Sequence, residues 1–480
     1  MKSGKEAVSA IQTGLRSECL SYTEVLAQSI SVIAPSTVPA AIVGLIYVTA
    51  GNGTWLSFLI GMLGLMLVSY NINQFSRRSA SAGSLYFFIA QGLGPVTGVI
   101  GGWALLFGYM ITGMSTLCGF SVASSEFLAQ FGLQPPTILL YAIGAGSAFI
   151  LAYKEAQISS RAMLIFECAA VVFVLALGLV IWGHSGFYLD PEQLYLTETT
   201  PGGVLMGVVL VVFGFSGFES STSLGEEAKD PLRSIPKSVI QSVVLSGFVF
   251  IFMAYVVVLG FKGLPDDLGK TESPLLYLST KLGWPLLGNF INLGVLLSFF
   301  SCTLASVNST ARIVYSMARH GLVYQALGES HKKNNTPHIA AAFASGFTFL
   351  MAALVNFFGS TPFQSQGYFG ALCSFGFLSA YFLVSLAAPI YLLHINQLSV
   401  KALLLSALAV GFMAIPFLGV IGIQGSDIFP PPEFPNNLLI WIFIAYMTIG
   451  ALWLLAVKIV NPSKLQALSG NPPEISGDQK

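Results

Sequence analysis

Two ionisable side chains lie well inside the long apolar stretches of this sequence. Glu219 follows the segment Gly214–Phe218, and Glu167 lies six residues after Arg161. If these stretches cross a membrane, a charge at mid-depth costs about 3 kcal/mol or more, so such residues mark ion or substrate paths. Glu219 is then either a proton-titrating group beside a substrate or a carboxylate that accepts hydrogen bonds from neighbouring backbone.

Glu167 has two interpretations of its own. It carries a proton during transport, or it pairs with Arg161 at the end of the same stretch. Glu24 and Glu126 lie near the ends of their stretches, where we expect both carboxylates to reach water.

The backbone of two apolar stretches is interrupted. The first contains Ala34-Pro35-Ser36-Thr37-Val38-Pro39, in which each proline removes a helical N–H donor. The second contains Gly214-Phe215-Ser216-Gly217-Phe218-Glu219, in which two glycines weaken a helix. The simpler interpretation of each is a kink that serves local packing. Unpaired backbone at membrane depth is tolerated only where it lines a cavity or is buried in protein.

The two interruptions fall in the first and sixth stretches, which are matching positions if stretches 1–5 and 6–10 are repeats. Such a pair is the best sequence pointer to a transporter's binding site. The predicted substrate site is therefore Ile33, Ala34, Ser36, Thr37, Val38, Phe213, Phe215, Ser216, Gly217, Phe218 and Glu219.

Backbone groups at these breaks are expected to bind the substrate. We find no lysine or arginine in the central part of the stretches, so a substrate carboxylate needs N–H donors near Ser36–Val38. An amine would face carbonyl groups near Ile33 and in Phe213–Ser216. Phe213, Phe215 and Phe218 either pack or act as gates that cover the substrate.

The eighth stretch is rich in small polar side chains: Ser298, Ser301, Cys302, Thr303 and Ser306. Hydroxyl groups on membrane helices usually bond to their own backbone or to a neighbouring helix. Those that face the first stretch could instead coordinate sodium together with its carbonyl groups. The predicted coupling residues are Glu167, Glu219, Cys302 and Ser306.

Composition shows which elements must position these residues. Hydrophobic residues make up 54% of the 480 and charged residues only 9%, whereas soluble domains carry roughly a quarter charged residues. Apolar runs of about 20 residues match a hydrocarbon core of about 30 Å.

Twelve spans are predicted, with eleven and thirteen as alternatives. The segment Ser84–Gly94 either begins the third helix or forms a re-entrant loop. The twelve are 24–50, 53–72, 96–124, 137–153, 161–183, 203–225, 237–261, 285–318, 338–358, 367–395, 401–423 and 437–459.

Charge predicts the orientation. With the N-terminus inside, the outer loops hold only Lys262, Lys270 and Lys281, and the other eighteen of the 21 lysines and arginines lie on the inner side. Both termini are therefore expected in the cytoplasm, with residues 1–23 as an N-terminal segment and 460–480 as a disordered tail. The 21 acidic residues balance the basic ones, which leaves no basic face for nucleic acid.

Other chemistries find little support in the sequence. The five histidines lie in loops or at span ends, no Walker-type loop is present, and the five cysteines lack metal or redox spacing. We expect no cofactor, no metal and no ATP-driven step. An integral-membrane transferase would need a catalytic cluster at one membrane face, and a channel fits paired broken helices less well than an occluded site does.

Three segments resemble one transporter family. They are Phe215–Glu219 continuing through Gly225–Pro236, Ala311–Leu322 with Thr336-Pro337-His338, and Ser81–Tyr86 with Gly102-Trp103. In this order they resemble the amino acid–polyamine–organocation permeases. The resemblance implies a five-plus-five inverted repeat (24–183 and 203–395, with helices 1 and 6 broken) and two further helices (401–459). It also implies secondary transport of an amino acid or small amine by alternating access, through proton coupling or exchange. A polyamine or cationic amino acid antiporter is the alternative.

The chain departs from that family in several places. The first break lacks the Gly-rich G-x-G-x-I pattern. Some proton-coupled members have a lysine in helix five, which would fall near Ala170, and this sequence has no lysine there.

Two residues fall at functional positions of an antiporter in the family. Glu219 matches its helix-six glutamate, and Phe213 falls where it has a gating tryptophan. The segment 124–137 has no cysteine, so the resemblance implies no disulfide-linked glycoprotein partner.

Overall fold

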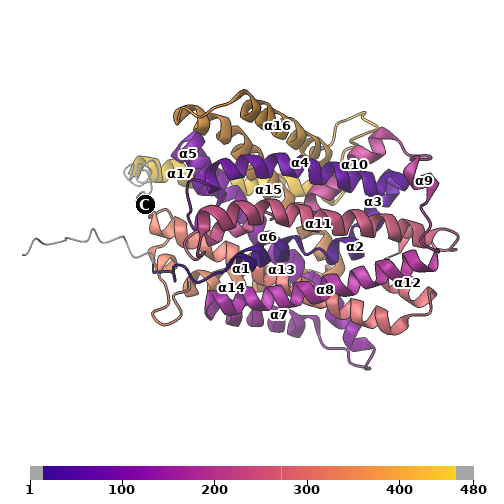
Figure 1. Ribbon diagram of the computed structural model, residues 1–480. Helices are drawn as coiled ribbons and strands as arrows, with labels where there is room; N and C mark the ends of the chain where they lie inside the picture. Colours follow the sequence, from indigo (N-terminus) through magenta and orange to yellow (C-terminus); the bar gives the residue numbers. More distant parts are fainter. Residues whose placement is uncertain (1–13, 272, 461–480) are drawn as a thin grey trace, which may run out of the picture.

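The computed structural model describes residues 14–271 and 273–460 (Figure 1). These residues form a bundle of helices and one isolated β-bridge, between Leu20 and Ala228. The predicted tail 460–480, except its first residue, and the first thirteen residues of the N-terminal segment lie outside the described part.

The α-helices are α1 (Tyr22–Ile33), α2 (Thr37–Ala41), α3 (Val43–Ala50), α4 (Thr54–Ser76), α5 (Leu85–Leu93), α6 (Pro95–Ala129), α7 (Thr137–Tyr153), α8 (Ala156–His184), α9 (Pro191–Leu194), α10 (Pro201–Gly214), α11 (Pro231–Phe261), α12 (Pro274–Lys281), α13 (Pro285–Arg319), α14 (His338–Phe357), α15 (Pro362–His394), α16 (Val400–Ile421) and α17 (Leu439–Val460). Short 3₁₀ helices are η1 (Gly51–Gly53), η2 (Ser220–Leu224), η3 (Leu268–Lys270), η4 (Gln325–Gly328) and η5 (Asn436–Leu438).

Length and hydropathy identify the helices that can cross a membrane. Within the described residues, nine helical segments are long and apolar enough, and α7 and α10 are shorter apolar helices. The prediction of an all-helical, multi-pass membrane protein is consistent with this architecture. One of the nine segments, Val43–Ser76, includes both α3 and α4.

Local sequence explains where many helices begin. Proline is the first residue of α6, α9, α10, α11, α12, α13 and α15, where its missing N–H removes no helical bond. Gly94 adopts a φ of 87° and separates α5 from α6. The segment 84–94 is therefore a short helix of its own after Ser84, and not the start of the long third helix.

The helices lie side by side in Figure 1, with the last turn of α17 at one end of the bundle and α9 and α12 at the other. We call these the C-terminal end and the α9 end. Helix α6 is almost wholly buried, α13 and α15 are mostly buried, and α16 and α17 are largely exposed. The core is thus built around α6, against which both α13 and α15 pack closely.

Candidate functional site

The first predicted interruption separates α1 from α2. Ala34 ends α1 in the left-handed conformation, with φ 51° and ψ 67°, and its N–H still donates to the Ile30 carbonyl. Pro35 has no N–H to continue the helix, and the Thr37 N–H donates back to the Ala34 carbonyl at 2.9 Å. Five predicted site residues lie in this turn, and all are buried: Ile33, Ala34, Ser36, Thr37 and Val38.

The second interruption separates α10 from η2. Gly217 lies in this turn with φ 86°, and a β-carbon there would lie 2.1 Å from Cγ1 of Val32 in α1. Only glycine fits such a position without strain. Phe213 is half-buried, whereas Phe215, Ser216, Phe218 and Glu219 are buried.

The structure brings the two interruptions together. The Ser220 hydroxyl donates to the Gln28 carbonyl at 3.1 Å, and the Ser221 N–H donates to the Ser29 hydroxyl at 3.0 Å. A β-carbon at Gly214 would lie 3.2 Å from the Val38 side chain. The predicted site residues of the two segments therefore form one region where α1, α2, α10 and η2 meet.

Glu219 accepts hydrogen bonds from two tyrosines that the sequence analysis missed. Tyr109 in α6 donates to Oε1 at 2.6 Å, and Tyr381 in α15 donates to Oε2. The Tyr381 hydroxyl in turn accepts from the Gly217 N–H at 2.8 Å. Two of its donors are therefore side chains, in addition to the neighbouring backbone groups of one predicted interpretation. A tyrosine in the middle of an apolar span was the available signal, because a buried hydroxyl needs a partner.

The three phenylalanines at the second interruption differ in their packing. Phe215 packs edge to face against Phe250, with ring centroids 4.8 Å apart. Phe218 packs against Tyr381 at 5.0 Å. Phe213 is the half-buried one, so it is the ring best placed to move without opening the core.

Glu167 is buried and does not pair with Arg161. The Ser298 hydroxyl on α13 lies 3.0 Å from each carboxyl oxygen. The predicted alternative, a Glu167–Arg161 pair, is wrong, because the Arg161 Nε lies 2.8 Å from Oε1 of Glu24. The prediction that Glu24 reaches water is also wrong, since Glu24 is 4% exposed. Glu126 is exposed, as predicted.

The polar residues of α13 face α1. The Ser301 and Ser31 hydroxyls are 2.9 Å apart, and the Cys302 thiol donates to the Val32 carbonyl at 3.1 Å. Ser306 is buried one turn further along α13. Of the four predicted coupling residues, Cys302 thus contacts the last turn of α1, directly before the first interruption.

The C-terminal end holds a buried ion pair. The Arg312 Nε and Nη2 donate to the two carboxyl oxygens of Glu227 at 2.5 and 3.0 Å, and both side chains are almost fully buried. The partner of Glu227 thus lies on α13. Arg312 falls near the end of the predicted span 285–318, outside the central part in which the sequence has no lysine or arginine. A buried Glu–Arg pair compensates the cost of desolvating each charge.

Residues 14–21, which we call the docked segment, pack against this ion pair. The Cys19 and Leu20 N–H groups both donate to the Glu227 carbonyl at 2.9 Å, and the Lys229 N–H donates to the Leu20 carbonyl. Arg16 forms an ion pair with Glu155 at 2.6 Å. The docked segment therefore ties the start of α1 to the segments before α11 and α8.

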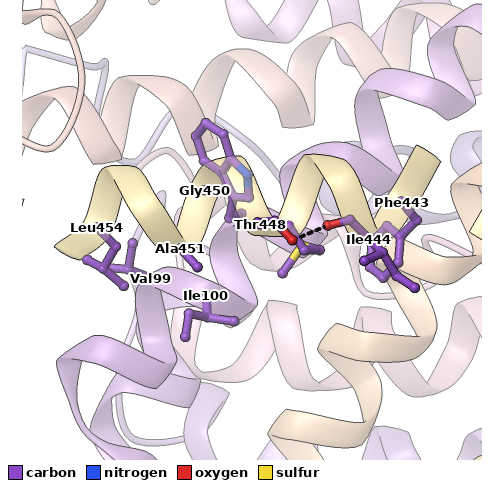
Figure 2. A pocket seen from close by; sticks show the side chains of 10 residues that line it. Val99, Ile100, Phe443, Ile444, Thr448, Gly450, Ala451 and Leu454 are labelled. Atoms are coloured by element: carbon purple, nitrogen blue, oxygen red, sulfur yellow. Dashed lines mark hydrogen bonds between the residues drawn. The ribbon is translucent and has the colours of Figure 1, made fainter. Parts of the chain in front are cut away.

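Two surface grooves lie away from this region. One, of about 300 Å³, runs between α6 and α17 and is lined mainly by apolar side chains, including Val99, Trp103 and Leu454 (Figure 2). Its Thr448 hydroxyl already donates to the Ile444 carbonyl at 2.8 Å. The other, of about 310 Å³, lies between α7 and α14. Neither contains a predicted site residue. Among the described residues, no group of three or more His, Cys, Asp or Glu could hold a metal ion.

Comparisons with known proteins agree on one family. The model of the amino acid permease family matches residues 25–466. A branched-chain amino acid permease of Bacillus subtilis is 26% identical over 362 residues, covering 71% of this chain and 74% of that protein. A low-affinity putrescine importer of Escherichia coli is 25% identical over 351 residues, covering 67% and 71%. A methylthioribose transporter of Bacillus subtilis is 23% identical over 333 residues, covering 64% and 70%.

Proposed function

Because this chain belongs to the amino acid permease family, we propose that it is a secondary active transporter that works by alternating access. The family and these relatives identify a multi-pass transporter of the plasma membrane, and not an enzyme. Its substrate is an amino acid or an amine. The observation that carries the mechanism is the contact between two interrupted helices, which the Ser220–Gln28 and Ser221–Ser29 hydrogen bonds support.

The proposal includes the topology predicted from sequence. Twelve spans form a five-plus-five inverted repeat (24–183 and 203–395) with two further helices (401–459), and both termini lie in the cytoplasm. Support comes from the interruptions in the first and sixth predicted spans and from the charge asymmetry of the loops. With this orientation, the C-terminal end faces the cytoplasm.

We assign the substrate carboxylate to the first interruption. Of the three N–H groups near Ser36–Val38, that of Thr37 donates to the Ala34 carbonyl. The Ser36 hydroxyl is buried and has no hydrogen-bond partner among the described residues. This hydroxyl and the N–H groups of Ser36 and Val38 are the donors that we assign to a carboxylate. The substrate amine faces carbonyl groups near Ile33 and in Phe213–Ser216.

Substitution of Ser36 tests this assignment. Ser36→Val should abolish substrate binding while the protein still folds, because it removes the hydroxyl and fills its space. Ser246→Val in α11 is the matched control, since Ser246 is also buried with an unpartnered hydroxyl. Unchanged affinity in Ser36→Val, measured by substrate-induced thermal stabilisation, would place the carboxylate elsewhere.

Coupling is assigned to Glu219 and Glu167, with Cys302 and Ser306 as further polar groups on α13. Each carboxyl lies beside an interruption, so a change in its charge acts where the helices bend. Exchange of polyamines or cationic amino acids is the second candidate function, and the name of the Escherichia coli putrescine importer favours it.

Transport by the purified full-length chain in liposomes tests the function as a whole. Labelled amino acids and amines should accumulate under an inward proton gradient or exchange against internal substrate. No uptake of any amino acid or amine under any ion gradient would contradict the proposed function.

A further inference from the structure

Two histidines and a tyrosine lie in contact at the C-terminal end of the bundle. His331 lies in the loop between η4 and α14, His338 is the first residue of α14, and Tyr153 is the last residue of α7. The ring centroids of His331 and His338 are 5.2 Å apart, and the Tyr153 ring lies 4.9 Å from that of His331. We call these three residues the His331 cluster, and none of them belongs to the predicted substrate site.

The hydrogen bonds of His331 assign its tautomer. Its Nδ1 accepts from the N–H groups of Lys333 and Asn334 at 3.3 and 3.1 Å, so this nitrogen carries no proton. The proton of the neutral ring is therefore on Nε2, which donates to the Tyr153 hydroxyl at 2.8 Å. A protonated histidine donates from both nitrogens and accepts at neither. Uptake of a proton at Nδ1 thus breaks both bonds to the backbone.

The turn that His331 caps fastens the start of α14 to the end of α7. The Asn335 N–H donates to the His331 carbonyl at 2.8 Å and closes the turn. The Asn334 amide and the Thr336 hydroxyl both donate to the Tyr153 carbonyl, at 2.9 and 2.8 Å. Because these donors sit in or next to the turn, its shape decides whether they reach Tyr153. The two helices that it joins lie side by side in Figure 1 and pack against each other.

The charges of the surrounding segments determine what a proton on His331 meets. These charged side chains are Arg16, Lys154, Glu155, Glu329, Lys332 and Lys333. Glu155 already pairs with Arg16, and Glu329 and the three lysines are exposed. His338 lies in the first turn of α14, where the helix dipole opposes a cation, and its buried Nδ1 has no hydrogen-bond partner among the described residues. Two positive rings 5.2 Å apart repel each other, so a single proton is enough to change the cluster.

The docked segment packs against both sides of the His331 cluster. A β-carbon on Gly14 would lie 2.4 Å from Oγ of Ser330, the residue directly before His331. Arg16 forms its ion pair with Glu155, two residues after the tyrosine of the cluster. The other end of the docked segment bonds to the backbone before α11. The cluster is therefore connected, through the docked segment, to the second interrupted helix and the segment that follows it.

We propose that the His331 cluster is a pH-sensitive switch that holds the docked segment in place when it is uncharged and loosens it when it is protonated. Histidine changes its charge between about pH 5 and 8. In the neutral form, His331 caps the turn; in acid, the Lys333 and Asn334 N–H groups lose their acceptor and the turn detaches from Tyr153. The switch is separate from the coupling assigned to Glu219 and Glu167, and only its cytoplasmic location rests on the proposed function.

Hydrogen exchange of the purified full-length protein, read by mass spectrometry, tests the switch. Rates are corrected for the intrinsic effect of pH on amide exchange. Between pH 8 and pH 5.5, protection of residues 333–336 should fall at least about fivefold, the equivalent of one hydrogen bond, and protection of residues 16–20 should fall with it. Unchanged protection of 333–336 overturns the proposal, and a loss confined to 333–336 overturns the link to the docked segment. No substrate is needed, so the outcome is independent of whether transport is observed.

A substitution that keeps the shape of the turn separates titration from structure. His331→Asn places a side-chain oxygen where it accepts from the N–H two residues on, as in an Asx-turn, but asparagine does not titrate. Protection of 333–336 in this variant should lose its pH dependence and stay near the value of the wild type at pH 8. His394→Asn, at an exposed histidine that ends α15, is the control and should keep the wild-type dependence. A full pH dependence in His331→Asn would assign the response to another group, such as His320 beside Tyr86, and would overturn the proposal.

Discussion

At the scale of single residues, the central feature is a carboxyl group held by two tyrosines from different helices. Glu219 ends the turn after α10, while Tyr109 and Tyr381 come from α6 and α15. A change in the charge of Glu219 alters the hydrogen bonds that hold these three elements together. One protonation event can therefore influence helices that are far apart in the sequence.

Replacement of Glu219 by glutamine keeps its shape and removes its titration. If coupling runs through this residue, Glu219→Gln should lose accumulation driven by a pH gradient but retain exchange of substrate across the membrane. Uptake with and without the gradient measures the difference, and Glu126→Gln at the exposed end of α6 is the control. A variant with wild-type pH dependence would show that Glu219 is structural and would move the coupling role to Glu167.

Removal of one partner of the Arg312–Glu227 ion pair should destabilise the protein. Arg312→Ala leaves Glu227 buried without a counter-charge, which costs about 3–5 kcal/mol, whereas apolar replacement of both partners recovers most of the loss. The exposed Arg233–Asp230 pair, with a separation of 3.9 Å, provides the control, and Arg233→Ala should change stability by less than about 1 kcal/mol. The midpoint of thermal unfolding in detergent measures both, and equal midpoints would refute the role of the buried pair.

At the scale of helices, the sequence predicted the two interruptions and the membrane class because proline, glycine and hydropathy act locally. Pro35 and Gly217 signal lost hydrogen bonds or unusual φ values without knowledge of any neighbour. Tyr109, Tyr381 and the Arg312 partner of Glu227 were not predicted, because each depends on contacts between segments more than 80 residues apart. Glu24 was misjudged for the same reason, since its partner Arg161 lies on α8.

The two interruptions should respond in opposite ways to exchange of glycine and alanine. Ala34 is left-handed, which costs a non-glycine residue about 1–2 kcal/mol. Ala34→Gly should therefore be tolerated or raise stability by up to about 1 kcal/mol, after the greater flexibility of glycine in the unfolded chain is subtracted. Gly217→Ala should lower stability, because its β-carbon would clash with Val32. Thermal unfolding compares the two, and a Gly217→Ala protein as stable as Ala34→Gly would show that the tight turn does not matter.

At the scale of the whole molecule, the α9 end is held by a cluster of ion pairs around Lys262. Lys262, just after α11, lies 2.6 Å from Asp190 and 2.7 Å from Glu192. Burial, the largest single influence, raises the pKa of the Asp190 carboxyl, but the hydrogen bonds from Lys262, Gln193 and the Glu192 backbone and the charge of Lys262 together outweigh it, so the pKa is lowered. Burial would likewise lower the pKa of Lys262, but its bonds to Asp190 and Glu192 raise it. These contacts fasten the segment before α10 to the end of α11.

The contribution of this cluster to stability should depend on pH. Asp190 stabilises the fold above about pH 4, and this contribution is lost as the pH falls through its lowered pKa. Lys262 stabilises the fold below about pH 10, and this contribution is lost as the pH rises through its raised pKa. Lys262→Met should cost about 1 kcal/mol at pH 7, and the difference from the wild type should shrink below pH 4. Lys270→Met, which removes the exposed ion pair with Asp267 at 3.9 Å, is the control and should show no such pH dependence in thermal unfolding. A loss of stability in Lys262→Met that does not change with pH would contradict the prediction.

The docked segment has a consequence for biosynthesis. A ribosome makes residues 14–21 first, but Glu227 and Lys229, to which their backbone bonds, follow about 200 residues later. Arg312, which neutralises Glu227, emerges later still. The contacts around the start of α1 therefore cannot be completed until α13 has been inserted. A nascent chain that stops before α13 lacks Arg312, the cation that neutralises the buried Glu227.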